Sequence, residues 1–379
     1  MPNSSQKLVA LNVMASSQSE IPFRNVIFSD AVRPSDSIDL TNIKDKTILI
    51  TGGASGFGAA FFREWAARGA NVIIGDINER MGTELVAELR RSTGNANHHF
   101  IRLDVTNWQS QASFFKEASK LSPHGGIDCV VANAGIADGE ENAQFEVPPD
   151  YSSMENPPAP RMKTLDVNLY GVMYTTTLAL SYLSRNPGSE ACSVGTCSRT
   201  RDRHLVLVAS IAGLAPLPSQ PIYATSKHGV VGLFRSLRFT APIQHGIRVN
   251  MLHPYFVDTP ILGSLGTVVL AGGGMAKIED VVHAATRLVA DQSVIGRALI
   301  IGGRADVQQV KAAGLQPADS LDKDHAIWDV YAHDFEQSDL FTRRIIAVTN
   351  LVTAARGWAG LFSDVSSKIT ATFWRLFGG

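Results

Sequence analysis

The sequence predicts an α/β fold, in which a doubly wound parallel sheet of seven strands carries helices on both faces. Two observations predict it. From Lys46 onward, short apolar runs alternate with longer segments whose apolar residues recur every three or four positions. A glycine-rich turn also joins the first apolar run to the first helical segment. An arm precedes this sheet domain, and a helical extension follows it, so we expect regions 1–43, 44–303 and 304–379.

The elements follow one another in a regular alternation. Buried strands are expected at 47–50, 71–76, 100–105, 127–132, 204–209, 246–252 and 297–301. Helices are expected at 59–68, around Met81 to Leu89, at 108–121, at 161–183, from Pro221 and at 278–290. Two polar insertions interrupt this pattern at 138–160 and 186–203. We expect the first, which is acidic and rich in proline, to be a mobile loop.

Composition narrows the class of protein. The 379 residues carry a net charge of −1, so no basic surface points to nucleic acid. Three cysteines without a scaffold spacing favour a reducing, cytoplasmic compartment, and neither these nor the histidines suggest a metal site. The apolar run after Lys7 is interrupted by Asn12, so we do not expect a cleaved signal. No run approaches the roughly 18 apolar residues that span a bilayer.

The segment 340–379 has a basic amphipathic pattern that allows two interpretations. It could lie on a membrane surface, which would make the protein membrane-associated. It could instead pack on the sheet domain or on another subunit, which is the commoner origin of such a stripe. Its apolar positions are Phe341, Ile345, Val348, Val352, Trp358, Phe362, Val365, Ile369 and Phe373.

The passage from Ser210 to Lys227 holds the candidate catalytic residues. A buried strand delivers Ser210 to its end, and Pro221 can begin a helix without losing a hydrogen bond. Tyr223 and Lys227 are four residues apart and therefore share one helix face. A cation beside a phenol favours the phenolate and lowers its pKa, which would make Tyr223 a usable base. The alternative is a core tyrosine with a solvated lysine.

The turn Gly52-x3-Gly56-x-Gly58 is a candidate dinucleotide site. It follows a strand and opens a helix, so backbone N–H groups can face a pyrophosphate. Asp76 ends the second strand, where a carboxylate can accept both hydroxyls of the adenosine ribose. A ribose phosphate would meet a like charge there, so NAD is favoured over NADP. Arg80 lies close enough to keep NADP open.

Taken together, these residues resemble the short-chain dehydrogenase/reductase family over about residues 44–303. The resemblance is to its NAD-dependent branch, which includes 15-hydroxyprostaglandin-dehydrogenase-like enzymes and fungal dehydrogenases of secondary metabolism. It implies a Rossmann-type sheet and subunits that assemble as a homodimer or homotetramer. The residues that carry it are Thr51, Gly52, Gly56, Gly58, Asp76, Asp104, Val105, Asn133, Ala134, Gly135, Asn168, Ser210, Tyr223, Lys227, Pro254, Val257 and Thr259.

The resemblance also implies roles for these residues. Tyr223 would be the acid/base, and Ser210 would orient the substrate oxygen. Lys227 would hold the nicotinamide ribose and lower the Tyr223 pKa, and Asn168 would hold a water that links Lys227 to solvent. The expected cofactor contacts are Gly52, Ser55, Gly56, Phe57, Gly58, Asp76, Ile77, Asp104, Val105, Asn133, Ala134, Gly135, Tyr223, Lys227, Pro254, Val257 and Thr259.

The expected activity is NAD-dependent interconversion of a secondary alcohol and a ketone. Apolar residues in the loops after the strands at 204–209 and 246–252 favour a lipophilic small molecule, such as a secondary metabolite. Tyr255 stands where the family usually has glycine after the proline, so the loop over the nicotinamide could be shaped differently. The alternatives are an NADPH-dependent ketoreductase of the same fold and a catalytically silent cofactor-binding scaffold.

Overall fold

The computed structural model describes residues 29–33, 36–193, 201–262, 275–303 and 326–330, together with 344, 345, 348, 351 and 355. One compact unit, Ile27–Ala332, contains the sheet. A second unit comprises Met1–Val26 and His333–Gly379. Most of the amphipathic segment 340–379 lies outside the described residues, but Ile345, Val348 and Leu351 are helical and exposed. None of the described helices is both long and apolar enough to cross a bilayer.

The predicted doubly wound α/β fold is confirmed, with one strand more than expected. The sheet has eight strands in the order β3-β2-β1-β4-β5-β6-β7-β8. Their bounds are Thr47–Thr51, Asn71–Asp76, His99–Arg102, Cys129–Ala132, His204–Val208, Arg248–Pro254, Ala298–Ile301 and Ile327–Val330, from β1 to β8. The strand order reverses beside β1, and the crevice outside the carboxyl ends at such a point is the usual ligand site.

The seven expected strands pair in parallel, and an eighth strand, which was not expected, lies at the edge of the described sheet. Strand β8 pairs antiparallel with β7, in a register that sets Ile301 opposite Ile327. It comes from a stretch beyond residue 303 that is mixed and polar in sequence. Four residues at an edge, with one apolar face, carry too little periodicity to be recognised.

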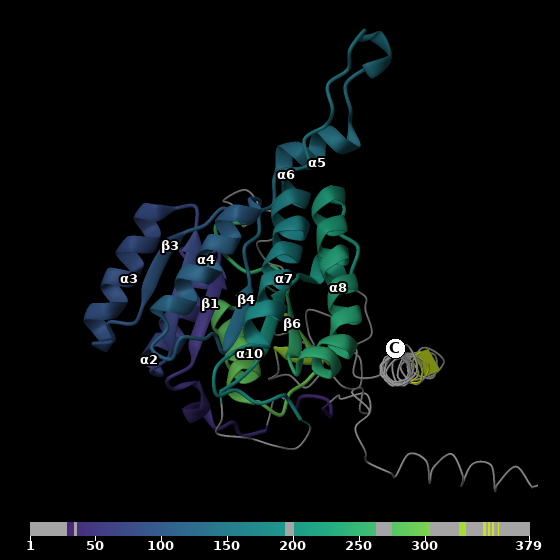
Figure 1. The fold of residues 1–379 in the computed structure, drawn as a ribbon. Helices are drawn as coiled ribbons and strands as arrows, with labels where there is room; N and C mark the ends of the chain where they lie inside the picture. Colours follow the sequence, from purple (N-terminus) through teal and green to yellow (C-terminus); the bar gives the residue numbers. More distant parts are fainter. Residues whose placement is uncertain are drawn as a thin grey trace, which may run out of the picture. The chain divides into compact units, whose positions relative to one another are not determined.

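Helices cover both faces of the sheet (Figure 1). On one side lie α2 (Gly56–Ala67), α3 (Glu79–Thr93) and α10 (Ile278–Ala290). On the other lie α4 (Trp108–Leu121), α7 (Gly171–Leu183) and α8 (Pro221–His245). Alternate strand residues serve the two layers: Ile48 and Ile50 of β1 enter the first cluster, and Leu49 enters the second. The described residues also contain three short 3-10 turns: Leu40–Ile43, Tyr151–Ser153 and Ile211–Gly213.

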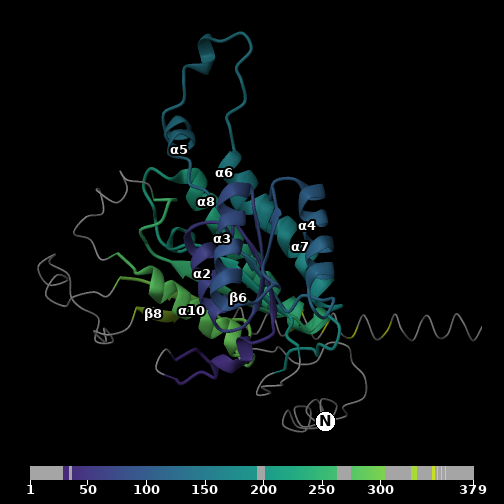
Figure 2. The same cartoon turned by 90° about the vertical axis from the view of Figure 1, so that its left-hand side faces the viewer.

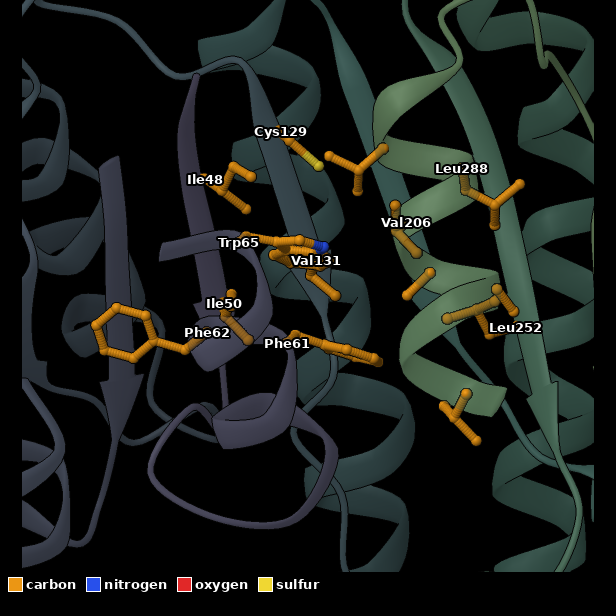
Figure 3. Packing of buried hydrophobic residues seen from close by; sticks show 14 of the residues in the cluster. Ile48, Ile50, Phe61, Phe62, Trp65, Cys129, Val131, Val206, Leu252 and Leu288 are labelled. Atoms are coloured by element: carbon orange, nitrogen blue, oxygen red, sulfur yellow. The ribbon is translucent and has the colours of Figure 1, made fainter. Parts of the chain in front are cut away.

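The first cluster fixes the strand that leads into the glycine turn. Phe61, Phe62 and Trp65 of α2 are fully buried and lie against β1 and β4 (Figure 3). Each such side chain contributes about 1.5–3 kcal/mol when removed from water. The Trp65 indole also donates a hydrogen bond to Thr286 Oγ1 of α10, at 3.0 Å. Helix α2 is therefore held by the sheet and by α10, and this packing fixes the position of the glycine turn at its start.

We had expected the first insertion to be a loop, but part of it is helical. It begins with α5 (Gly139–Glu146), because Asp138 Oδ1 accepts a hydrogen bond from Glu141 N at 3.1 Å and caps the helix. Residues 147–162 then form an arm that projects away from the sheet beyond α5 and α6 (Figures 1 and 2). The expected helix 161–183 is in three pieces: α6 (Lys163–Leu165), a π-helical turn (Asp166–Tyr170) and α7.

Candidate active site

The glycine turn after β1 is shaped so that side chains are excluded from it. Gly52 and Gly56 have positive φ angles of 65° and 51°. A Cβ atom on Gly58 would stand 2.2 Å from the Gly52 carbonyl oxygen. Ser55 precedes α2, and its side chain makes no cap. The turn therefore presents bare backbone at a helix start, which fits the pyrophosphate of a dinucleotide.

The loop after β4 is bound directly to this turn. Asn133 Nδ2 donates hydrogen bonds to the carbonyl oxygens of Thr51 and Gly52, both at 3.0 Å. Thr51 Oγ1 in turn accepts from the backbone N–H groups of Asn133 and Ala134, both at 3.1 Å. These contacts hold the loop that carries Asn133 and Ala134 against the glycine turn, and the expected role of these residues in lining the cofactor cleft stays a prediction.

Asp76 lies at the end of β2, against the glycine turn. Its Oδ2 accepts a hydrogen bond from Ala54 N at 3.0 Å, and its Oδ1 accepts one from Asn78 N at 2.9 Å. Ile77 beside it is exposed. Arg80 is paired with Glu84, at 3.2 Å, rather than with Asp76. The Asp76 carboxylate is thus held against the glycine turn, and its expected contact with an adenosine ribose stays a prediction.

Most of the other expected cofactor residues end or follow β3 and β6 at the carboxyl edge of the sheet. Val105 is buried against Gly171, and Asp104 Oδ1 accepts a hydrogen bond from Thr106 N at 2.9 Å. Pro254 ends β6. Val257 forms a bridge with Ala276. Thr259 approaches the turn, since its Cβ would lie 4.0 Å from a Cβ on Gly56. Phe57 packs partly buried on the first cluster, so its ring serves the core as well.

Ser210 and Tyr223 are brought together from β5 and α8. Ser210 follows β5, and its Oγ accepts a hydrogen bond from Ala212 N at 3.2 Å. Burial raises the pKa of Tyr223, and a hydrogen bond with the Ser210 side chain offsets part of that rise. The sequence led us to expect a lowered pKa, so for the protein chain alone the expected direction was wrong. Loss of hydration outweighs the hydrogen bond with Ser210.

Lys227 is buried beside Tyr223. Its Nζ lies 5.7 Å from the centroid of the Tyr223 ring and donates a hydrogen bond to the Val208 carbonyl oxygen at 3.3 Å. Burial lowers the pKa of Lys227 to about 8. A Cβ on Gly135 would stand 3.5 Å from Nζ, so the loop after β4 passes directly over the ammonium. The alternative of a solvated lysine does not hold.

Asn168 lies in the π-helical turn, a type of helix defect that often marks functional sites. Its Oδ1 accepts a hydrogen bond from Ile136 N at 2.8 Å, and its Nδ2 donates to the Ile136 carbonyl oxygen at 2.8 Å and to Ser226 Oγ at 3.1 Å. Ser226 Oγ donates onward to the Tyr223 carbonyl oxygen at 2.7 Å. The Asn168 side chain therefore connects the β4 loop to α8. Its expected role in holding a water stays a prediction.

Three further residues support the site, and the sequence had not singled them out. They are Glu141 and Asn142 of α5 and Ser226 of α8. The signal Asp138-x-x-Glu141 marks a helix start and could have revealed α5. No sequence signal shows which distant helix its side chains contact. Among the described residues, no cluster of His, Cys, Asp and Glu side chains could hold a metal ion.

Together these groups form a site suited to moving a proton at a carbinol oxygen. A hydroxyl, a phenol and an ammonium follow β5 and lie on α8, and the glycine turn follows β1 at the same carboxyl edge of the sheet. The residues present fit a dinucleotide along this edge, because a Cβ atom is excluded at Gly58 and Asp76 is bonded to the turn.

Comparisons with known proteins agree with this arrangement. The sequence profile described as short chain dehydrogenase matches residues 46–268. A 5'-hydroxyaverantin dehydrogenase of Dothistroma septosporum is 36% identical over 275 residues, covering 70% of this chain and 87% of the relative. The human 15-hydroxyprostaglandin dehydrogenase [NAD(+)] is 32% identical over 225 residues, covering 59% of this chain and 73% of the relative.

Solved structures show the same fold. A 3-ketoacyl-(acyl-carrier-protein) reductase from Brucella melitensis, complexed with NADH, aligns with a TM-score of 0.54 and 25% identity. The alignment covers 68% of this chain and 97% of that one.

Proposed function

Because this chain belongs to the short-chain dehydrogenase/reductase family, we propose that it oxidises a lipophilic secondary alcohol to a ketone with NAD as hydride acceptor. The observation that carries the proposal is the meeting of Ser210, Tyr223 and Lys227 at the crevice that begins at the glycine turn. When bound, the nicotinamide supplies the hydride chemistry. Everything else must come from the residues of the chain.

In this proposal, Tyr223 removes the hydroxyl proton of the substrate, and Ser210 holds the same oxygen. The two side chains lie close enough for Ser210 to affect the pKa of Tyr223, so a substrate oxygen between them would find one donor and one proton acceptor. Lys227 would favour the phenolate and hold the nicotinamide ribose. Its buried ammonium costs free energy in the folded chain, as its lowered pKa shows, and a neighbouring phenolate would offset that cost.

NAD is the proposed cofactor rather than NADP. Asp76 holds a negative charge at the turn, and Arg80 is engaged by Glu84 instead of being available for a phosphate. The human relative is named as an NAD(+) enzyme, in line with this choice. An NADPH-dependent ketoreductase would require the opposite charge arrangement.

A lipophilic substrate is supported by the apolar surface after β6 and β5. Tyr255 and Phe256 pack edge to face with ring centroids 4.8 Å apart, and Ile261 is exposed nearby in sequence. Leu214 is only partly buried. The name of the Dothistroma relative describes a dehydrogenase of a hydroxylated compound, which is consistent with a hydroxylated secondary metabolite as the substrate class.

A panel of aliphatic and aromatic secondary alcohols tests the proposal, with NADH or NADPH formation followed by absorbance. We expect turnover with NAD, and we expect Tyr223→Phe to abolish it while NADH still binds. Full activity in Tyr223→Phe would remove the assigned role. Binding of NADH without turnover of any alcohol or ketone would favour the silent scaffold instead.

Three other expectations remain proposals: a homodimer or homotetramer, a cytoplasmic location, and a separate role for 304–379. Size-exclusion chromatography with light scattering tests the assembly. Flotation with anionic liposomes, with and without residues 340–379, tests membrane contact, and equal behaviour of the two forms would contradict it.

A further inference from the structure

Helix α8, which carries Tyr223 and Lys227, begins without a cap of its own. Its N-cap residue is Gln220, whose side chain makes no capping hydrogen bond. Pro221 has no N–H to satisfy. Ala224 N donates to the Gln220 carbonyl oxygen at 2.8 Å. The N–H groups of Ile222 and Tyr223 remain, and helix starts need acceptors for such groups.

Asn142 of α5 supplies that acceptor from 80 residues away in the chain. Its Oδ1 accepts hydrogen bonds from Ile222 N at 2.9 Å and from Tyr223 N at 3.4 Å. Its Nδ2 donates to the Asp138 carbonyl oxygen at 2.7 Å, which fixes the direction of the amide. Asn142 is fully buried. The backbone of Tyr223 is thus held at its N–H by Asn142 and at its carbonyl oxygen by Ser226.

The preceding residue, Glu141, makes the matching contact with the other helix of the site. Its Oε2 accepts hydrogen bonds from the backbone N–H of Thr164, at 3.1 Å, and from the Thr164 hydroxyl. Thr164 belongs to α6, which leads directly into the π-helical turn that carries Asn168. Two neighbouring side chains of α5 therefore bind the starts of both segments that bring polar groups to Lys227.

We propose that α5 is a positioning element, in which Asn142 sets the place of Tyr223 and Glu141 sets the place of the turn that carries Asn168. The proposal rests on the proposed function, in which Tyr223 is the acid/base. Asn142 touches neither the crevice nor a reacting atom by this account; it acts through the backbone of Tyr223. Small displacements of a reacting group lower rates steeply.

The location of α5 gives this arrangement a second consequence. The exposed arm 147–162 leaves from the end of α5 and returns at the start of α6, and the contact between Glu141 and Thr164 closes its base (Figure 2). A substrate or partner that displaced the arm would pull on the same residues that hold Tyr223. Through α5, the arm 147–162, which lies outside the family's motifs, is connected to the proposed acid/base Tyr223.

The test compares Asn142→Ala with Asn95→Ala as the matched control. Asn95 donates its amide to the Ala70 carbonyl oxygen, at 3.2 Å, and to Asn71, at the amino end of β2 and so at the opposite edge of the sheet from the crevice. Both changes remove an amide that makes several hydrogen bonds, Asn142 being fully buried and Asn95 partly buried, and we expect both to lower the unfolding temperature. Asn142→Asp keeps an oxygen acceptor at the helix start, where a negative charge is also favourable.

Turnover is measured with the best alcohol of the panel, and NADH binding is measured by fluorescence. For Asn142→Ala we expect kcat to fall roughly 10-fold with unchanged NADH affinity, while Asn95→Ala keeps kcat and Asn142→Asp recovers most of it. Hydrogen exchange should show faster exchange of the amides of residues 222 and 223 in Asn142→Ala alone. This measurement requires no substrate.

Wild-type kcat in Asn142→Ala, or equal kcat losses in Asn142→Ala and Asn95→Ala, would overturn the proposal. Unchanged exchange at residues 222 and 223 would overturn it as well. These outcomes differ from a failure of the proposed function, because that failure appears as full activity in Tyr223→Phe, whatever Asn142 does.

Discussion

The ammonium of Lys227 lies 5.7 Å from the centre of the Tyr223 ring, one helical turn along α8. Burial acts on the two groups in opposite directions: it raises the pKa of the phenol and lowers the pKa of Lys227 to about 8. Burial therefore disfavours the charged form of each group. Because the charged forms attract each other, the two titrate as a pair.

The pH dependence of turnover should report this pair. As pH rises through about 8, the pair loses one proton, so alcohol oxidation, which needs a base, should increase and ketone reduction, which needs an acid, should decrease. In Lys227→Met only the phenol remains, and its pKa is raised above its usual value of 10.0. The rise in oxidation should then move to higher pH. Profiles of kcat in both directions check this, and an unmoved profile in Lys227→Met would contradict it.

Replacing Asp76 with serine should shift cofactor preference. The carboxylate repels a ribose phosphate and also holds the glycine turn through Ala54 N. We expect the ratio of kcat/KM for NAD to that for NADP to fall by roughly 10-fold or more, which corresponds to about 1.4 kcal/mol or more. Arg80→Ala is the control, since Arg80 is paired with Glu84 and should leave the ratio nearly unchanged. A wild-type preference for NADP would itself contradict the role of Asp76.

Gly58→Ala should eliminate cofactor binding, because its Cβ would stand 2.2 Å from the Gly52 carbonyl oxygen and 2.9 Å from Asn133 Nδ2. The turn would have to open to relieve this overlap. Gly232→Ala provides the contrast, since a Cβ at that exposed position of α8 meets nothing within 4 Å. That change should stabilise the helix by about 0.5–1 kcal/mol and leave NADH affinity unchanged. Calorimetric titration with NADH measures the affinity of both variants, and thermal unfolding measures the change in stability.

A buried carboxylate at the amino ends of the strands should dominate acid stability. Asp202 accepts hydrogen bonds from Lys46 Nζ at 2.8 Å and from Arg248 Nη2 at 2.6 Å. Burial alone would raise the pKa of Asp202, but Arg248 and Lys46 outweigh it and hold the pKa far below its ordinary value. Its stabilising contribution is therefore present above the unfolded pKa of about 3.9 and is lost as pH falls below it.

Asp202→Ala should accordingly cost about 3–5 kcal/mol in urea unfolding at neutral pH, because two buried cations lose their partner. Glu88→Ala, which removes the exposed partner of Arg63, should cost less than about 1 kcal/mol. Similar losses in the two variants would show that the buried cluster contributes no more than a surface pair.

Much of the site could be predicted because its residues lie in regular elements. Ser210 follows closely after a strand of mostly apolar residues, and the spacing of Tyr223 and Lys227 fixes their common helix face. The alternation of strands and helices predicted the doubly wound parallel sheet with helices on both faces. Only the edge strand β8 was missed, since four residues leave hardly any pattern.

The parts that could not be predicted depend on packing between distant segments. The sequence around Asn142 shows an acidic, proline-rich insertion, and nothing in it indicates that its amide caps a helix 80 residues away. The extra residue in the π-helical turn at Asn168 has no local signature either. The direction of the Tyr223 pKa depends on how completely the ring is buried, and that is set by the whole fold.

Strand β8 has a practical consequence for anyone who shortens this chain. Ending the polypeptide at Gly303, the boundary expected from the sequence, would expose the hydrogen-bonding edge of β7, which β8 now covers from Ala298 to Ile301. It would also remove Asp329, whose carboxylate accepts hydrogen bonds from Val32 N and Arg297 Nε. Such an edge recruits strands from other molecules, so a trimmed protein should precipitate or self-associate even with every group of the crevice intact.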